Sequence, residues 1–197
     1  MILTLDASGE GFGAACVRDG AVLAQRFQDG ARGSAGLLPA MADAVLREAG
    51  GALEAVAAVV GPGGFTGLRA ALSLAQGLGL AAGVPVWGVT VGDALWVPTP
   101  GRALWVAVDT RRGGVFLQRG AAVQAFSPDA LPDPPGPVAL AGNAAALAAE
   151  RLRGRGHDVL VLPGVLPTPA GIAAAALRGP ARPAQPLYVD PPAARPM

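Results

Sequence analysis

The feature that most limits the folds open to this chain is an internal repeat. An apolar strand that ends in aspartate occurs twice, in Leu3–Ser8 and in Val106–Arg111, so that Asp6 and Asp109 are 103 positions apart (109 minus 6). A glycine-rich turn follows each copy, and Asp19–Val22 matches Arg119–Val123 further along. Internal duplication is the simplest explanation of such a repeat.

Hydrophobic periodicity predicts the elements of the first half. Three short apolar runs, with a hairpin turn at Arg18–Gly20, predict an antiparallel meander. From Leu37 to Ala49 apolar residues recur at helical spacing until Gly50 and Gly51 end the helix. Strands and helices alternate along the chain from this point, which is typical of α/β folds. The expected strands are Ile2–Asp6, Gly13–Arg18, Val22–Phe27, Ala55–Val60 and Val84–Val89, and the expected second helix is Phe65–Ala82.

The second half repeats this pattern in a shorter form. The proline-rich stretch Val97–Gly101 separates the halves, which predicts subdomains at residues 1–97 and 98–197. The expected elements are a proline-rich loop at Ser127–Pro137, strands at Val138–Ala141 and Val159–Leu162, a helix at Asn143–Arg153 capped by Asn143, and a helix at Thr168–Leu177. Two meanders that each lead into α/β units are typical of the duplicated ribonuclease-H-like fold of actin, sugar kinases and chaperone ATPases (the ASKHA type), here with a reduced second half.

Composition excludes several classes of protein. Cys16 and His157 are the only cysteine and the only histidine, so this chain alone can form neither a disulfide framework nor a zinc cluster. The net charge is +1 and no run of basic residues occurs, so a partner would supply most of the contacts to any bound RNA. Ala70–Gly92 is long enough to span a bilayer, but Gly83 and Pro85 divide it into a helix and a strand. The first residues lack a secretion signal, which predicts a cytoplasmic protein.

The loop at Gly61–Gly64 joins a strand directly to a helix N-terminus, where backbone N–H groups could hold an anion. No lysine follows, so the loop lacks the side chain that contacts a transferred phosphate. Asp6 and Asp109 end equivalent strands, where actin-type enzymes place carboxylates near a nucleotide-bound metal. The candidate nucleotide or anion site therefore comprises Asp6, Gly61, Gly63, Gly64, Thr66 and Asp109. The alternative is structural: the glycines form a tight turn and each aspartate caps one.

The helix Phe65–Ala82 is apolar on more than one side, so it must be covered on more than one side. Its small residues Gly67, Ala71, Ala75 and Gly79 would permit close approach of another helix. The cover could be a partner protein, or the first helix of the same chain through Met41 and Val45.

No catalytic constellation is evident. Ser34 and Ser73 lie outside any G-x-S-x-G elbow, and one histidine could serve as base. His157 follows Arg155 and Gly156 in a polar turn and is predicted to lie at the surface. The residues favour a chain without a catalytic or metal site.

The segment Gly61-Pro62-Gly63-Gly64-Phe65-Thr66-Gly67-Leu68-Arg69, continued by Ala75-Gln76-Gly77-Leu78, resembles the signature of the TsaB (YeaZ) family. Leu3–Ser8, Leu37–Pro39 and Val108–Phe116 resemble further family motifs in the same order. Residues 186–189 resemble its closing strand. Gly64, Gly33 and Gly114 depart from the usual Ser, His and Glu, so any role of those polar groups is either absent here or taken by other residues.

The resemblance implies a non-catalytic dimerisation subunit in the formation of N6-threonylcarbamoyladenosine next to the anticodon of tRNAs. Its implied partner is TsaD, which carries the metal and transfers the threonylcarbamoyl group. TsaE is implied as an ATPase that joins through the TsaB–TsaD complex, and TsaC makes the threonylcarbamoyl donor. The tRNA would contact this chain only indirectly. The two N-terminal helices would form the contact, through Leu38, Met41, Val45, Leu68, Arg69, Leu72 and Gln76. A homodimer could form without TsaD. The resemblance implies no required cofactor, although a nucleotide near the interface is compatible with it. The alternatives are an actin-type nucleotide-binding protein and an M22-type glycoprotease-like peptidase.

Overall fold

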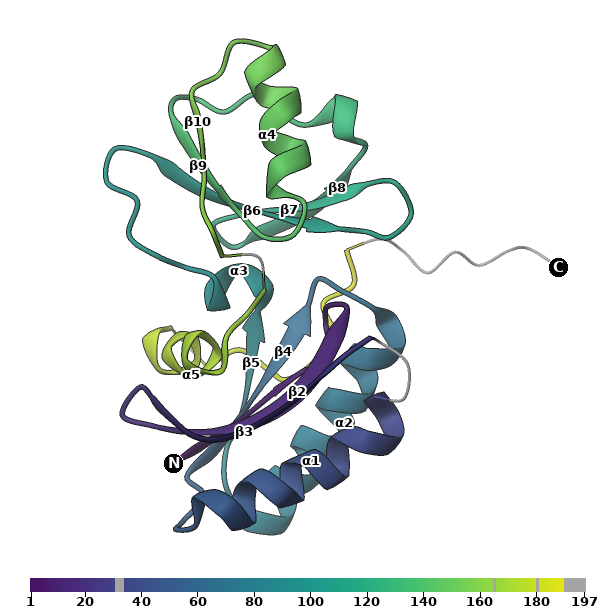
Figure 1. Cartoon of the computed structure of the whole chain (residues 1–197), viewed down its shortest axis with the longest axis vertical. Coiled ribbons are helices and arrows are strands. Elements are labelled where there is room, and N and C mark those ends of the chain that lie inside the picture. The colour runs from purple at the N-terminus through teal and green to yellow at the C-terminus, as the bar shows by residue number, and fades with distance from the viewer. Residues whose placement is uncertain (31–33, 165, 180, 190–197) are drawn as a thin grey trace, which may run out of the picture. The chain divides into compact units, whose positions relative to one another are not determined.

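The computed structural model describes residues 1–30, 34–164, 166–179 and 181–189 (Figure 1). The chain forms two compact units. Unit 1 comprises Met1–Ala94 and Pro167–Leu187, and unit 2 comprises Leu95–Leu166 and Tyr188–Met197. The first boundary is close to the predicted one at residue 97. The return of residues 167–187 to unit 1 differs from the predicted sequential division, because the last helix packs on the sheet of unit 1.

Unit 1 is built on a five-stranded sheet in the order β3-β2-β1-β4-β5. The first three strands are antiparallel neighbours, and the last two run parallel to β1. Their bounds are Ile2–Asp6 for β1, Gly11–Arg18 for β2, Ala21–Asp29 for β3, Ala55–Gly61 for β4 and Val86–Thr90 for β5. This confirms the predicted meander and the strand–helix–strand unit after it.

Helices cover both faces of this sheet. The helices α1 (Ser34–Ala49) and α2 (Phe65–Ala82) pack side by side on one face, and α5 (Pro169–Arg178) packs on the other (Figure 1). The short helix α3 (Val91–Ala94) follows β5 and contacts α5. Helix α2 has the predicted bounds and ends at Gly83, whose φ of 66° is one that glycine adopts readily.

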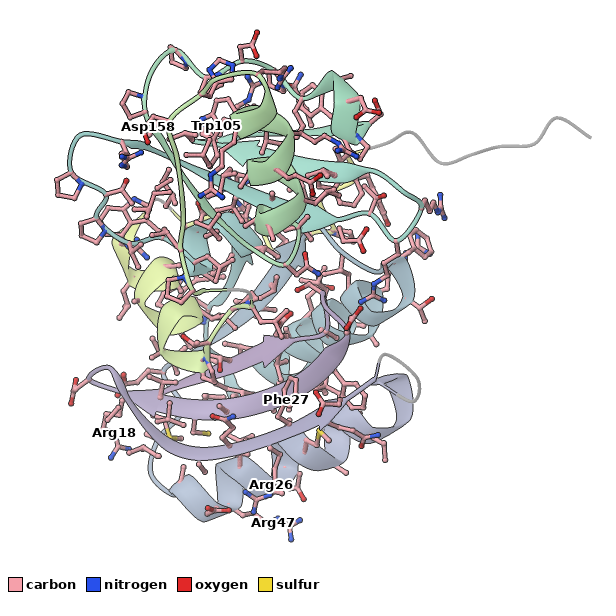
Figure 2. The ribbon with its side chains drawn as sticks, turned by 45° about the horizontal axis from the view of Figure 1, so that its top comes forward. Arg18, Arg26, Phe27, Arg47, Trp105 and Asp158 are labelled. Carbon is pink, nitrogen blue, oxygen red and sulfur yellow. The ribbon has the colours of Figure 1, made fainter. Side chains whose placement is uncertain are left out.

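The core of unit 1 lies between the sheet and the α1–α2 pair. Side chains alternate across a strand, so Leu3 and Leu5 of β1 face the same side and are fully buried there. Leu38 and Val45 of α1 and Leu72 of α2 meet them from the helices. Burial of each side chain of this size stabilises the folded state by roughly 1.5–3 kcal/mol relative to leaving it exposed. At the sheet edge, Arg26 of β3, which is labelled in Figure 2, pairs with Glu48 of α1.

Unit 2 repeats the sheet of unit 1 strand by strand. Its order is β10-β9-β6-β7-β8, which matches β5-β4-β1-β2-β3, with the same antiparallel and parallel neighbours. The shared order confirms the duplicated α/β architecture. The bounds are Ala103–Asp109 for β6, Val115–Arg119 for β7, Ala122–Phe126 for β8, Val138–Ala141 for β9, Val159–Val161 for β10 and Ala145–Gly154 for α4, with a short 3₁₀ turn η1 at Pro128–Ala130.

Two predictions about local structure were wrong. Asn143 does not cap α4: Ala144 is the N-cap residue, while the Asn143 Oδ1 accepts a hydrogen bond from the N–H of Asp109 at 2.9 Å. Residues 186–189 do not form a closing strand: they have no strand pairing, although the Leu187 N–H donates to the Val60 carbonyl, and the nearby bridge to Gly88 is made by Arg182. Among the described residues, no helix is long and apolar enough to cross a membrane.

Candidate functional site

The glycine loop after β4 lies directly against the end of β1. A β-carbon on Gly63 would overlap the carbonyl oxygen of Ser8, so this approach requires glycine. The N–H of Gly64 donates to the same carbonyl oxygen at 3.0 Å. Gly61 has a φ of 124°, which also favours glycine. The loop therefore has the structural role that the sequence left open as an alternative.

The two aspartates of the repeat have the same local geometry. The Oδ1 of Asp6 accepts a hydrogen bond from the N–H of Ser8 at 2.8 Å, and the Oδ1 of Asp109 accepts one from the N–H of Arg111 at 2.8 Å. Burial raises the pKa of the Asp6 carboxyl, and its hydrogen bonds to Ser8 partly offset this rise. Each aspartate thus caps a turn in its own unit.

The candidate anion site is therefore partly occupied by the chain itself. The N–H of Gly64 is bonded to Ser8 and is not available to an anion in this conformation. Thr66 is exposed, and the N–H of Leu68 belongs to the first turn of α2, where it donates to the Gly64 carbonyl at 3.0 Å. A nucleotide at these residues stays a prediction.

The small residues of α2 pack within unit 1. A β-carbon on Gly67 would overlap the Ala7 carbonyl oxygen, and one on Gly79 would overlap the Val86 side chain. Ala71 and Ala75 are fully buried in the core of unit 1. Gly67 and Gly79 thus bring α2 close to its own sheet, while Ala71 and Ala75 belong to a core that the predicted neighbouring helix α1 shares.

The residues predicted to contact a partner divide into two groups. Most are buried in the core of unit 1, and the remainder face outward at least in part. The buried ones are Leu38, Val45, Leu68 and Leu72; Met41 is half-buried, and Arg69 and Gln76 are exposed. The cover within the chain, which the sequence offered as an alternative, accounts for the buried group. The Leu72 side chain is 3% exposed, so it cannot touch a partner in this fold.

Arg69 and Gln76, which were predicted to contact a partner, belong to a stripe of exposed residues on α2 whose other members, Phe65 and Leu80, were not identified from the sequence. Phe65 and Leu80 are 53% and 86% exposed, and Arg69 and Gln76 lie between them at helical spacing. The Arg69 guanidinium stacks over the Phe65 ring, 3.9 Å from its centroid. The signal was the i, i+4 spacing of residues 65 and 69, continued at 76 and 80. We call Phe65, Arg69, Gln76 and Leu80 the α2 stripe.

The segment 182–187 borders the α2 stripe. The Gln76 Nε2 donates to the Ala184 carbonyl oxygen at 2.9 Å, and Ala184 itself is buried. The N–H of Gly88 donates to the Arg182 carbonyl at 2.8 Å, and the N–H of Leu187 to that of Val60 at 2.9 Å. The segment is thereby attached to α2, β4 and β5, and Gln76 positions it.

The described residues hold no group of three or more His, Cys, Asp or Glu side chains that could bind a metal ion. Cys16 is buried in β2, and this burial raises the pKa of its thiol, which disfavours the nucleophilic thiolate. His157 was predicted to lie at the surface. Its side chain is half-buried, and its Nε2 lies 2.7 Å from the Asp133 Oδ1. Cys16 belongs to unit 1 and His157 to unit 2. These placements give the peptidase interpretation no support.

Comparison with known proteins identifies the family. The model of the family "TsaD: tRNA N6-adenosine threonylcarbamoyltransferase" matches residues 28–133, more than half of the chain. The chain belongs to this family. Within it, the chain resembles TsaB (YeaZ), the relative that its motifs indicated. The uncharacterized proteins Mb3455c of Mycobacterium bovis and Rv3421c of Mycobacterium tuberculosis are each 38% identical to it, over 100% of this chain and 94% of theirs.

Solved structures of other proteins confirm the fold of this chain. An uncharacterized protein from Pseudomonas aeruginosa with similarity to peptidase YeaZ has a TM-score of 0.76 at 24% identity, over 96% of this chain and 99% of that one. YeaZ from Pseudomonas aeruginosa has a TM-score of 0.74 at 24% identity, over 95% and 98%. The ROK hexokinase of Thermus thermophilus has a TM-score of 0.50 at 16% identity, over 89% and 97%. The predicted actin-like, duplicated ribonuclease-H-like fold is confirmed.

Proposed function

We propose that this chain is the non-catalytic subunit that binds TsaD in the complex that forms N6-threonylcarbamoyladenosine next to the anticodon of tRNAs. The observation that carries the proposal is the α2 stripe on a helix whose opposite face is buried in the core of unit 1, in a chain of the TsaD family whose described residues hold no metal-binding cluster. Exposed apolar residues at helical spacing are typical of a surface that docks another helix.

The stripe has the composition of an interface centre. Phe65 and Leu80 provide apolar area, and Arg69 is a type of residue that is enriched at interfaces. The buried leucines of α1 and α2 then act indirectly: they hold the helices in place, and the exposed residues make the contact.

The proposal extends to the rest of the complex. TsaE would join through the TsaB–TsaD pair, and tRNA would bind mainly through the partners. The α2 stripe could also support a homodimer where TsaD is absent. The reaction takes place on tRNA, so a cytoplasmic location fits the proposal. No cofactor is needed by a subunit with this role.

A second candidate is an actin-type nucleotide-binding protein, which the fold favours. Asp6, Gly61, Gly63, Gly64, Thr66 and Asp109 would then surround the nucleotide. Calorimetric titration of the isolated chain with ATP and magnesium separates the two functions, because tight binding that depends on magnesium would support this second candidate. Peptidase activity is the third and weakest candidate.

The test of the first proposal is co-purification with TsaD of the same organism. A variant of the predicted interface residue Leu72, such as Leu72→Glu, is unsuitable for this test. Leu72 is buried, so the substitution would place a charge in the core and unfold unit 1. Leu80→Lys is better, because Leu80 is exposed near the C-terminal end of α2, where a cation is favourable. We expect this variant to fold normally and to retain far less TsaD than the wild type.

The matched control is Leu177→Lys. Leu177 is 68% exposed near the C-terminal end of α5, also in unit 1. This variant should bind TsaD as the wild type does. Equal retention of TsaD by both variants would remove the α2 stripe from the interface, and no retention by the wild type would end the proposal.

A further inference from the structure

The turn between β6 and β7 presents two adjacent arginines on a fixed backbone. The Oδ1 of Asp109 accepts from the N–H of Arg111, and the Oγ1 of Thr110 accepts from the N–H groups of Arg112 at 3.2 Å and of Gly114 at 2.9 Å. The N–H of Thr110 donates to the Gly114 carbonyl at 3.1 Å. Arg111 has a φ of 58°, a conformation uncommon for a residue with a side chain. We call Arg111 and Arg112 the arginine tip.

The arginine tip is open to solvent. Arg111, Arg112 and Gly113 are all exposed, and a side chain on Gly113 would meet no atom within 4 Å. Within the described part of the chain, neither guanidinium has a hydrogen-bond or ion-pair partner; only the backbone N–H groups of the two residues are bonded. An extended backbone could therefore approach the tip without displacing any contact.

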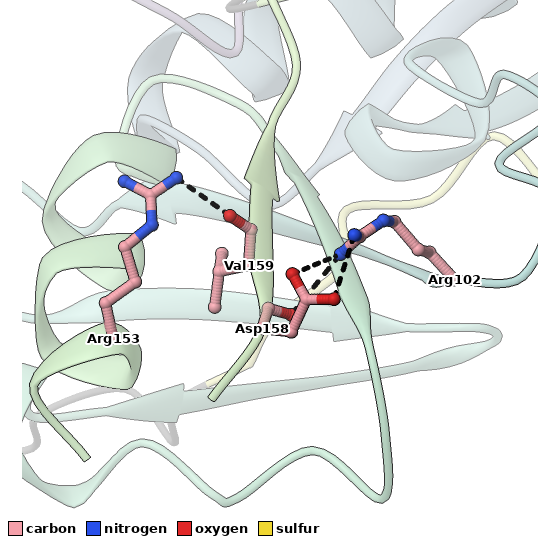
Figure 3. A network of polar contacts seen from close by, with 4 residues as sticks. All are labelled: Arg102, Arg153, Asp158 and Val159. Atoms are coloured by element: carbon pink, nitrogen blue, oxygen red, sulfur yellow. Dashed lines mark hydrogen bonds and ion pairs between the residues drawn. The ribbon is translucent and has the colours of Figure 1, made fainter. Parts of the chain in front are cut away.

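The other arginines between residues 95 and 164 are already engaged. Residues 95–164 contain seven arginines and five carboxylates, an excess of two positive charges (7 minus 5). Arg102 binds Asp158 through two hydrogen bonds of 2.9 Å, and Arg153 donates to the Val159 carbonyl at 2.8 Å (Figure 3). The remaining pairs are Arg151 with Asp129, Arg155 with Asp133, and Arg119 with Gln124 beside the Trp105 and Phe126 rings.

The excess charge of residues 95–164 is thus concentrated at the arginine tip, where the Asp109 carboxylate accepts the backbone N–H of Arg111 within the turn. Arginine presents a planar fork of donors that matches two oxygens of a phosphate and stays charged at every physiological pH. We propose that the arginine tip binds phosphate groups of an RNA backbone.

RNA is favoured over an acidic protein for two reasons. The family model that matches the chain describes an enzyme that acts on tRNA. The proposed protein interface, the α2 stripe, lies in unit 1, whereas the tip lies in unit 2. The inference rests on the proposed function, since it makes this subunit a minor direct contact for the same tRNA.

The test compares R111Q/R112Q with R119Q/R153Q. Both variants lose two positive charges in unit 2, but Arg119 and Arg153 bind neutral groups, so their replacement leaves no carboxylate without its partner. Glutamine removes the charge but keeps a polar side chain, so the substitution should leave the backbone conformation unchanged. Each variant is purified alone and with TsaD, and its affinity for labelled tRNA is measured by fluorescence anisotropy over about 50–200 mM salt.

We expect R111Q/R112Q to bind tRNA roughly tenfold more weakly at ~0.1 M salt, with the slope of log K against log salt reduced by about 1 to 2. R119Q/R153Q should keep the wild-type slope. An unchanged slope in R111Q/R112Q, an equal loss in both variants, or no tRNA binding by any sample overturns the inference.

Co-purification with TsaD is scored separately. If wild type and R111Q/R112Q both retain TsaD, a changed slope supports the inference. If only R111Q/R112Q loses TsaD, the tip contacts protein and the inference is overturned. If even the wild type fails to retain TsaD, the proposed function fails, and the slopes of the isolated chains decide the inference about the tip on the same criteria.

Discussion

Asp6 and Asp109 occupy equivalent positions in a duplicated fold, yet their surroundings have diverged. Each binds the N–H of the residue two positions ahead at 2.8 Å. Asp109 is exposed beside the arginine tip, while Asp6 is partly buried and its burial raises the pKa of its carboxyl. The same turn therefore places a carboxyl in solvent in unit 2 and in a less hydrated environment in unit 1.

The raised pKa of Asp6 gives a prediction with a definite sign. When a carboxyl has a higher pKa in the folded state, the folded state binds more protons, so the free energy of unfolding falls as pH rises from the unfolded pKa through the folded pKa. Asp6→Asn removes this penalty and keeps an oxygen for the Ser8 N–H. Urea unfolding should find the variant more stable than wild type at pH ~7, with the difference shrinking toward pH ~4. Lower stability of the variant at neutral pH would contradict the view that burial disfavours the charged form of Asp6.

At the scale of elements, periodicity was enough to place the strands and helices but not to orient them. Helix α2 has the bounds that its sequence predicts, yet Leu68 and Leu72 face its own sheet and the α2 stripe faces outward. A helix that is apolar on several sides does not reveal which side its sheet will cover. That choice depends on contacts distant in sequence, such as Gly63 with Ser8 and Gln76 with Ala184.

Two identical substitutions in the loop and in α2 should have opposite effects. Gly63→Ala forces a methyl group onto the Ser8 carbonyl and should destabilise unit 1 by about 1–3 kcal/mol. Gly77→Ala adds a methyl group in open space within the helix and should stabilise it by about 0.5–1 kcal/mol. Chemical denaturation of both variants measures the difference. Equal effects would mean that the loop does not pack against β1 as described.

At the scale of the whole molecule, sequence order and spatial order differ. The predicted division into 1–97 and 98–197 followed the repeat, but α5 and the segment 182–187 return to unit 1. Their apolar residues Ile172 and Ala184 are buried there. The repeat could not reveal this return, because unit 1 already has its full set of five strands from the first half.

Truncating a core leucine or isoleucine should therefore affect the unit in which it packs. Ile172→Ala and Leu152→Ala each remove a fully buried side chain, at a cost of about 2–5 kcal/mol. Hydrogen exchange should quicken in β1–β5 for Ile172→Ala and in β6–β9 for Leu152→Ala. Faster exchange in β6–β9 after Ile172→Ala would contradict the assignment of α5 to unit 1.

The return of residues 167–187 also sets the order in which the chain can fold during synthesis. A ribosome adds about 5–20 residues per second, so the sheet of unit 1 waits roughly 5–20 s between its own completion and the arrival of α5. During that interval the face of the sheet that α5 covers is bare, and it offers a hydrophobic surface to chaperones and to neighbouring nascent chains. The strands of unit 2 and its helix α4 all lie within residues 103–161, so they are synthesised before α5 reaches the sheet of unit 1.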